Sequence, residues 1–195
     1  GPAGVGKTRL AKECLAVGEA SGCATALAVA SRAARGIPLG ALATLLPAMP
    51  EAAASGIGLL QYAQEGLAQL AGDRPLLLVV DDAHSLDDAS AVLLQQLAGA
   101  RTAFIVATVR TGEAVPEPVA ALWKEGLAER VELGTLDEDS TELLLEQVLG
   151  APVEAIAVHQ LWEASQGNVL YLLELVLSAL ETHTPPKPEA ANPLA

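Results

Sequence analysis

Hydrophobic and polar residues follow two different periods along the chain, which predict strands and helices in turn. Apolar residues recur at helical spacing over 7–20, 57–71, 88–98 and 119–127, with a short helical stretch near 39–46. Between these helices lie stretches that are short and apolar enough to be buried strands, at 24–30, 76–80, 103–109 and, more weakly, 130–133. Apolar strands that alternate with helices are typical of an α/β fold, in which helices cover both faces of a parallel sheet.

The pattern changes after residue 135, where three helices follow one another without a strand. Asp137 is expected to cap the first helix, Pro152 to stand at the first residue of the second, and Asn168 to cap an apolar third helix. The expected domains are an α/β core over 1–135, a helical subdomain over 136–182 and a proline-rich tail or linker over 183–195.

Composition and charge narrow the functions open to the chain. Its 195 residues exceed one typical domain of ~150 residues, which fits a core with an appendage. Eleven Lys and Arg against 24 Asp and Glu leave a net charge of −13, so the surface repels nucleic-acid phosphates. No apolar run approaches the ~20 residues of a membrane span, and the two cysteines lack the spacing of a zinc site. We therefore expect a cytoplasmic protein that contacts neither membrane nor, through this segment, DNA.

The first eight residues carry the most specific chemical pattern. Gly1-Pro2-Ala3-Gly4-Val5-Gly6-Lys7-Thr8 matches G-x-x-x-x-G-K-[ST], a loop whose backbone N–H groups surround a phosphate at the start of a helix. Lys7 would reach the β- and γ-phosphates, and the Thr8 hydroxyl would bind Mg²⁺. The alternative is a glycine-rich turn before a helix.

A second pattern lies at the end of the apolar stretch 76–80, where Asp81 and Asp82 follow directly. Asp81 would hold the hydration shell of Mg²⁺, which keeps several waters and needs few protein ligands. Asp82 would polarise the water that attacks the γ-phosphate. By itself, the pair has an alternative in two solvated carboxylates at a strand end.

Arg110 follows the next apolar stretch, 104–109. Because the carboxyl ends of parallel strands lie at one edge of a sheet, Arg110 and the two carboxylates are expected to meet there. Arg110 would then contact the γ-phosphate, and the alternative is a surface residue at a strand end. His84 is open between a sensor of the γ-phosphate and a cap of its loop. Asp87 or Asp88 is expected to cap the next helix rather than bind a ligand.

Together these motifs resemble the ATPase domain of large LuxR-type transcriptional regulators, which belong to the signal-transducing (STAND) class of P-loop ATPases. The loop resembles a Walker A motif, the Asp81–Asp82 strand a Walker B motif, and Arg110 a sensor-1 residue. That family often carries D-D-x-H-x-x-D after the Walker B strand, found here as Asp81-Asp82-Ala83-His84-Ser85-Leu86-Asp87. It also carries G-N-P-L-x-L-x-E-L, matched from Gly167 to Leu175 with one change. The resemblance covers the chain to about residue 182.

The resemblance implies ATP or ADP with Mg²⁺ as cofactors, and a sheet of the additional-strand (ASCE) branch with the order 5-1-4-3-2. It also implies a first strand before Gly1, so we expect an N-terminally truncated fragment with two unpaired strand edges. In the family, a C-terminal helix-turn-helix contacts DNA, which we expect to lie outside this chain. Val169 departs from the family, which has at this position the Pro thought to contact adenine.

These expectations converge on a slow ATPase that acts as the nucleotide switch of a signal-responsive transcriptional regulator and self-associates on ATP binding. Its catalytic residues would be Asp82, Lys7 and Arg110, with Thr8 and Asp81 as metal ligands. The residues expected to contact the nucleotide are Gly1, Gly4, Val5, Gly6, Lys7, Thr8, Arg9 and Asp81. Two other functions stay open: a housekeeping ATPase of the AAA type, and a non-catalytic scaffold that binds nucleotide.

Overall fold

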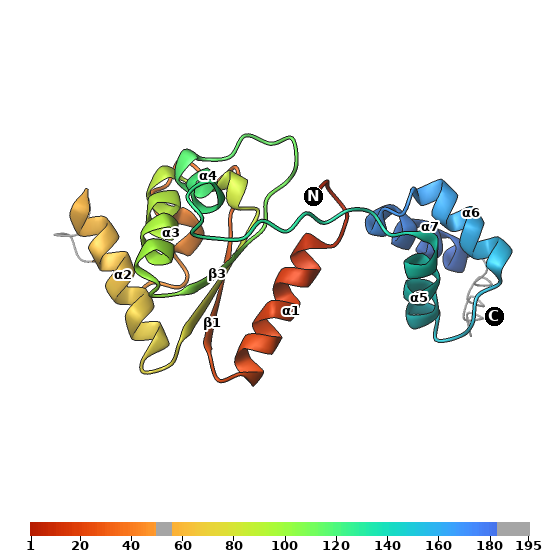
Figure 1. Ribbon diagram of the computed structural model, residues 1–195, viewed down its shortest axis with the longest axis horizontal. Coiled ribbons are helices and arrows are strands. Elements are labelled where there is room, and N and C mark those ends of the chain that lie inside the picture. Colours follow the sequence, from red (N-terminus) through yellow and green to blue (C-terminus); the bar gives the residue numbers. More distant parts are fainter. Residues whose placement is uncertain (50–55, 183–195) are drawn as a thin grey trace, which may run out of the picture. The chain divides into compact units, whose positions relative to one another are not determined.

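The computed structural model describes residues 1–49 and 56–182, and its first compact unit is Gly1–Leu133. This unit holds a three-stranded parallel sheet in the order β1-β2-β3, with β1 at Ala24–Val29, β2 at Leu76–Asp81 and β3 at Phe104–Ala107. Around the sheet lie α1 (Lys7–Ala20), α2 (Ile57–Ala71), α3 (Asp88–Ala100), α4 (Glu117–Lys124) and the 3₁₀ turns η1 (Gly40–Leu42) and η3 (Ala83–Ser85) (Figure 1). The predicted α/β fold, a parallel sheet between helices, is confirmed.

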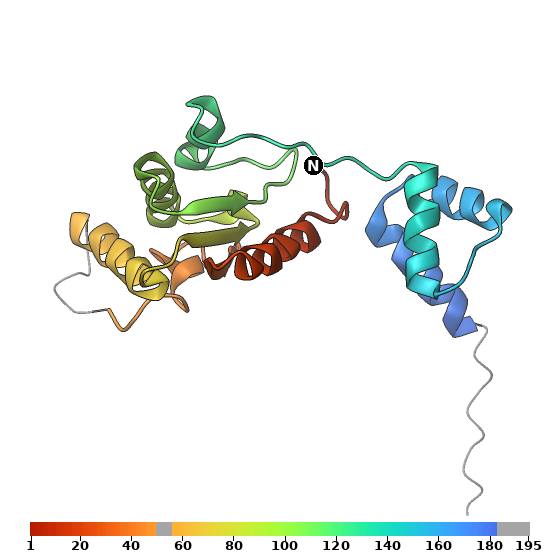
Figure 2. The same ribbon diagram turned by 60° about the horizontal axis from the view of Figure 1, so that its bottom comes forward.

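β2 is the middle strand and is buried along its whole length. Leu78 and Val80 belong to the core under α2 and α3, whereas Leu77 and Val79 pack with Ala11 of α1. Figure 2 shows α1 and α3 on opposite sides of the sheet. A strand with helices on both faces needs apolar side chains at every position, which explains the uninterrupted apolar run in the sequence.

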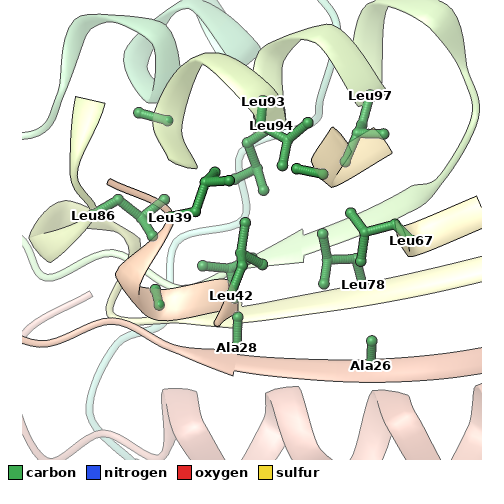
Figure 3. Close-up of a cluster of buried hydrophobic side chains, with 14 of the residues drawn as sticks. Ala26, Ala28, Leu39, Leu42, Leu67, Leu78, Leu86, Leu93, Leu94 and Leu97 are labelled. Atoms are coloured by element: carbon green, nitrogen blue, oxygen red, sulfur yellow. The ribbon is translucent and has the colours of Figure 1, made fainter. Parts of the chain in front are cut away.

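The larger core lies between the sheet and the helices α2 and α3. Figure 3 shows the leucines of α3 converging on Leu78 of β2 and Leu42 of η1, with Ala26 and Ala28 of β1 beneath them. The alanines of β1 leave room for the turn η1 to approach the strand closely. Complete burial of each such leucine contributes about 1.5–3 kcal/mol, so this aliphatic packing needs no aromatic side chains.

A glycine fixes the position of α1 against the sheet. A Cβ atom added at Gly18 would lie 2.4 Å from Leu77 Cδ2 and 3.3 Å from the Thr25 methyl group, so the helix backbone lies directly on the strands. This close approach sets where the start of α1, and the loop before it, lies relative to the end of β2.

The prediction of a strand over 130–133 is wrong. In the described residues β3 pairs with β2, and no ladder joins it to 130–133. A strand exists through hydrogen bonds to a neighbouring strand, so apolar alternation alone does not make one. Val131 is 71% exposed, and the Thr111 hydroxyl donates to Glu132 Oε1 at 3.0 Å from an adjacent loop.

Other element boundaries shift by a few residues. The helix predicted at 88–98 continues through Gly99 and ends at Ala100, and the one predicted at 119–127 lies at Glu117–Lys124. The stretch near 39–46 forms only the short turn η1. β3 is shorter than the predicted 103–109, because its ladder with β2 runs only from Phe104 to Ala107.

The second unit begins at Gly134 and is helical, with α5 (Glu138–Leu149), α6 (Ala155–Ser165) and α7 (Val169–Thr182). Its core joins the three helices through Leu145, Val158, Leu172 and Val176. Asp137 caps α5 as predicted, since its carboxylate accepts from Ser140 N at 2.9 Å. The prediction for Pro152 is wrong, because α6 begins only at Ala155. The predicted tail, 183–195, lies outside the described residues. Within the described ranges, no helix has the length and apolar character needed to cross a bilayer.

Asp87 ties the start of α3 to the loop that follows β1. Its side chain is 5% exposed and accepts from Ser90 N (2.9 Å), from the Ser90 hydroxyl (2.6 Å) and from Leu39 N (3.0 Å). Leu39 has a left-handed φ of 59°, so this bond holds a strained backbone in place. Of the two carboxylates considered from sequence, Asp87 is the helix cap and Asp88 is the first helical residue.

We predict that Asp87→Ala destabilises the first unit by about 2–3 kcal/mol, because it removes a helix cap and leaves the Leu39 N–H buried without a partner. Hydrogen exchange of α3 peptides across a urea series measures this free energy. The matched control is Asp88→Ala, an exposed neighbour whose loss costs about 0.5 kcal/mol. Equal effects of the two substitutions would contradict the anchoring role.

Candidate functional site

The start of α1 and the end of β2 meet through two predicted metal ligands. The Thr8 hydroxyl donates to Asp81 Oδ2 at 2.8 Å, although 73 positions separate the two residues in the chain. Asp81 is the last residue of β2 and is 6% exposed. The two residues that the sequence analysis expects to bind Mg²⁺ therefore lie within hydrogen-bond distance of each other.

Thr108 is a site residue that the sequence analysis missed. Thr108 is 7% exposed. Its hydroxyl donates to Asp81 Oδ1 at 2.6 Å and accepts from Asp82 N at 2.8 Å. Thr108 thus holds Oδ1 of the Asp81 carboxylate and leaves Oδ2 to accept from Thr8. The signal in the sequence is a polar residue at the end of an apolar strand. From the sequence, the site role at this strand end is assigned to Arg110, two positions later, and not to Thr108.

Asp82 and Arg110 form an ion pair at the same edge of the sheet. Arg110 Nε donates to Asp82 Oδ1 at 3.3 Å and Arg110 Nη2 to Asp82 Oδ2 at 3.2 Å. Asp82 has a left-handed φ of 56°, a conformation that Asp tolerates better than most residues. This backbone turn ends β2 and presents the Asp82 side chain, 27% exposed, beside that of Arg110.

The loop before α1 has the backbone that an anion site requires. Gly4 and Gly6 have left-handed φ angles of 81° and 94°, and Gly6 precedes a helix with no side-chain cap and no acidic residue in its first turn. Uncapped N–H groups at a helix start attract anions. The Lys7 ammonium donates to the carbonyl oxygens of Gly1 (2.9 Å) and Pro2, so it lies over the same loop.

Two cations, Lys7 and Arg110, lie close enough at this loop for their charges to interact. Partial burial lowers the pKa of Lys7, and the nearby Arg110 cation lowers it further, while the carboxylates of Asp82, Asp81 and Glu132 oppose the shift. Two cations that repel each other are both stabilised by an anion placed between them. The chain as a whole has a net charge of −13, which repels anions, so the neighbouring cations Lys7 and Arg110 are a local exception to that charge.

A cleft of about 430 Å³ lies beside the Asp82–Arg110 pair. Its lining includes Ser31, Arg32, Asp82, His84, Arg110 and Glu113. Arg32 Nη2 donates to both carboxylate oxygens of Glu113, at 3.0 and 3.2 Å, and this second ion pair joins the segments that follow β1 and β3. Polar groups from the ends of all three strands therefore surround one opening.

Two of the residues expected to contact the nucleotide, and two residues of the 167–175 motif, have contacts elsewhere or structural roles. Arg9 is 81% exposed and pairs with Glu13 one turn along α1, away from the loop. Val5 is buried. A Cβ atom at Gly167 would lie 2.0 Å from the Leu136 carbonyl oxygen, so this position has no room for a side chain. The Asn168 side chain accepts from Leu170 N at the start of α7. Local structure therefore explains both residue types.

Across residues 1–49 and 56–182, no three His, Cys, Asp or Glu side chains gather into a metal-binding group. A site of the Thr8–Asp81 kind, with one carboxylate, suits Mg²⁺ bound together with phosphate oxygens. No family model matches the chain, and no curated protein does either. The assignment of this site therefore depends on the contacts of its own residues.

We predict that Thr108→Val accelerates hydrogen exchange of the Asp82 amide at least about tenfold, because the substitution removes the hydroxyl that accepts from it. Exchange measured by NMR tests this directly. Thr108→Ser, which keeps the hydroxyl, should restore most of the protection. Thr102→Val is the matched control, since the Thr102 hydroxyl is 3.4 Å from the Leu97 carbonyl oxygen and lies outside the site. Unchanged Asp82 exchange in Thr108→Val would contradict the positioning role.

Proposed function

We propose that this chain binds ATP with Mg²⁺ and hydrolyses it slowly, as the nucleotide switch of a signal-responsive transcriptional regulator. The observation that carries the proposal is the 2.8 Å bond between Thr8 and Asp81. It joins the two motifs that sequence alone assigned to phosphate and metal, at the start of α1 and at the end of β2.

The phosphate end of the nucleotide would lie on the loop 1–8. The uncapped start of α1 offers backbone N–H groups, and Lys7 offers an ammonium beside them. Binding would draw the Lys7 ammonium from the carbonyls of Gly1 and Pro2 to phosphate oxygens, which are stronger acceptors. Burial and the Arg110 charge lower the pKa of Lys7, and a phosphate beside the ammonium would oppose both effects.

Thr8 and Asp81 fit a magnesium ion, because their oxygens are hard ligands and Thr108 fixes the orientation of the Asp81 carboxylate. The ion would neutralise charge on the phosphates as the bond to the leaving group breaks. Asp81 keeps its orientation through Thr108 whether Thr8 turns to the metal or not.

Asp82 is the residue suited to accept a proton from water, since its carboxylate is partly exposed at the cleft. Its ion pair with Arg110 restrains it, which would make turnover slow. The same ion pair is the observation in favour of the second candidate function, a non-catalytic module that binds nucleotide without hydrolysing it.

A switch requires that ATP and ADP differ in their contacts with two conformations. Lys7, Arg110 and the Thr8–Asp81 pair would all contact the γ-phosphate or its metal. The STAND-class resemblance supports a role in transcriptional control, with DNA contacted by a domain outside this chain. Val169 stands where the family has the Pro thought to contact adenine, so this position gives no support for a preference for adenine.

We predict that Lys7→Ala weakens Mg²⁺-dependent ATP binding at least about tenfold, since it removes a charge-assisted hydrogen bond to phosphate. Asp82→Asn should bind ATP within about threefold of the unmodified protein and lose at least about nine-tenths of its phosphate release. Titration calorimetry and a multiple-turnover phosphate assay on the purified protein measure the two quantities.

Lys12→Ala is the matched control, because Lys12 is exposed on the same helix. It should leave both quantities unchanged. Unaltered ATP affinity in Lys7→Ala would overturn the phosphate site. Phosphate release no greater in the unmodified protein than in Asp82→Asn would overturn the ATPase and leave the nucleotide-binding scaffold.

A further inference from the structure

His84 carries a buried polar atom without a partner. It lies in the turn η3, directly after the site carboxylates, and is 6% exposed. Among side-chain nitrogens and oxygens of the described residues, His84 Nδ1 is the buried atom that makes no hydrogen bond. Burying an imidazole nitrogen unpaired costs free energy, so such a position in a functional cleft calls for a partner in another state of the protein.

The nearest carboxylate to this nitrogen is that of Asp82. The distance from His84 Nδ1 to Asp82 Oδ1 is 3.9 Å, too long for a hydrogen bond. Arg110 holds both Asp82 oxygens at 3.3 and 3.2 Å. The Asp82 backbone is fixed by the bond from its N–H to Thr108, so only its side chain is free to change partner.

We propose that His84 is the second partner of Asp82, and that Asp82 exchanges Arg110 for His84 when Arg110 turns to a phosphate anion. This inference rests on the proposed function. In the exchanged state His84 Nδ1–H donates to Asp82, and the distance shortens to the ~2.8 Å of a charge-assisted bond. His84 is then a positioning residue, which holds the carboxylate toward the cleft once the guanidinium has left.

Two partners competing for one carboxylate form a bistable element. An anion that binds Arg110 removes one partner and so favours the other. The pairing with His84 lowers the cost of releasing Arg110, because a buried nitrogen gains its hydrogen bond at the same time. His84 therefore strengthens the preference for a bound γ-phosphate without touching it.

The first experiment needs no nucleotide. In the Arg110→Met variant Asp82 has lost its guanidinium partner, so an exchange-protected Nδ1–H proton of His84 should appear in histidine-labelled NMR spectra. The chain has three histidines, and loss of the resonance in Arg110→Met/His84→Asn assigns it. Arg32→Met is the matched control, since it breaks the other ion pair of the cleft and should produce no such proton. An Arg110→Met spectrum without that proton would overturn the inference and leave the proposed function intact.

The second experiment compares affinity for MgADP with and without beryllium fluoride, a mimic of the γ-phosphate. His84→Leu should reduce the gain from beryllium fluoride about tenfold (~1.4 kcal/mol). His84→Asn should retain most of it, because the Asn amide also donates a hydrogen bond from a short side chain. His159→Leu, at an exposed histidine, is the control. A full gain in His84→Leu would overturn the inference, whereas no MgADP binding by the unmodified protein would overturn the proposed function and the inference with it.

Discussion

The site depends on the hydrogen bonds that the Asp81 carboxylate accepts. It ends the fully buried middle strand, and it accepts from Thr8 at 2.8 Å and from Thr108 at 2.6 Å. These bonds join α1, β2 and the segment after β3 at one point. A buried carboxylate is stable only when donors surround it, so the same group fixes the packing of three elements and the positions of the Thr8 and Asp81 oxygens that we propose as metal ligands.

The charges of the site follow from that arrangement. Lys7 and Arg110 lie close enough for the arginine to lower the pKa of the lysine, and the carboxylates nearby offset the repulsion. Arg110 is paired with Asp82, and the Lys7 ammonium donates to loop carbonyls. Under the proposed function, a phosphate would replace the internal partner of each cation, and Asp82 would then pair with His84, whose Nδ1 makes no hydrogen bond in the structure.

Much of this fold follows from periodicity and chemistry local to each element. The helix 57–71 and the strand at 76–81 lie where the apolar pattern placed them, since one is amphipathic and the other uniformly apolar. The strand predicted over 130–133 does not form, because a strand depends on pairing with a neighbouring strand that the local sequence does not reveal. Thr108 was missed for a related reason. A threonine at a strand end gains its meaning only when the fold places its hydroxyl between Asp81 and the Asp82 amide.

Paramagnetic broadening by Mn²⁺, which replaces Mg²⁺ at oxygen ligands, tests most directly whether Thr8 and Asp81 form the metal–nucleotide site. The amides of these two residues should broaden first when a small amount of Mn²⁺ is added with ATP, and much less with Mn²⁺ alone. The acidic helix α5, which has Glu138 and Asp139 in its first turn, is the competing place for an adventitious cation. Broadening that begins in α5 and leaves Thr8 and Asp81 sharp would contradict the account.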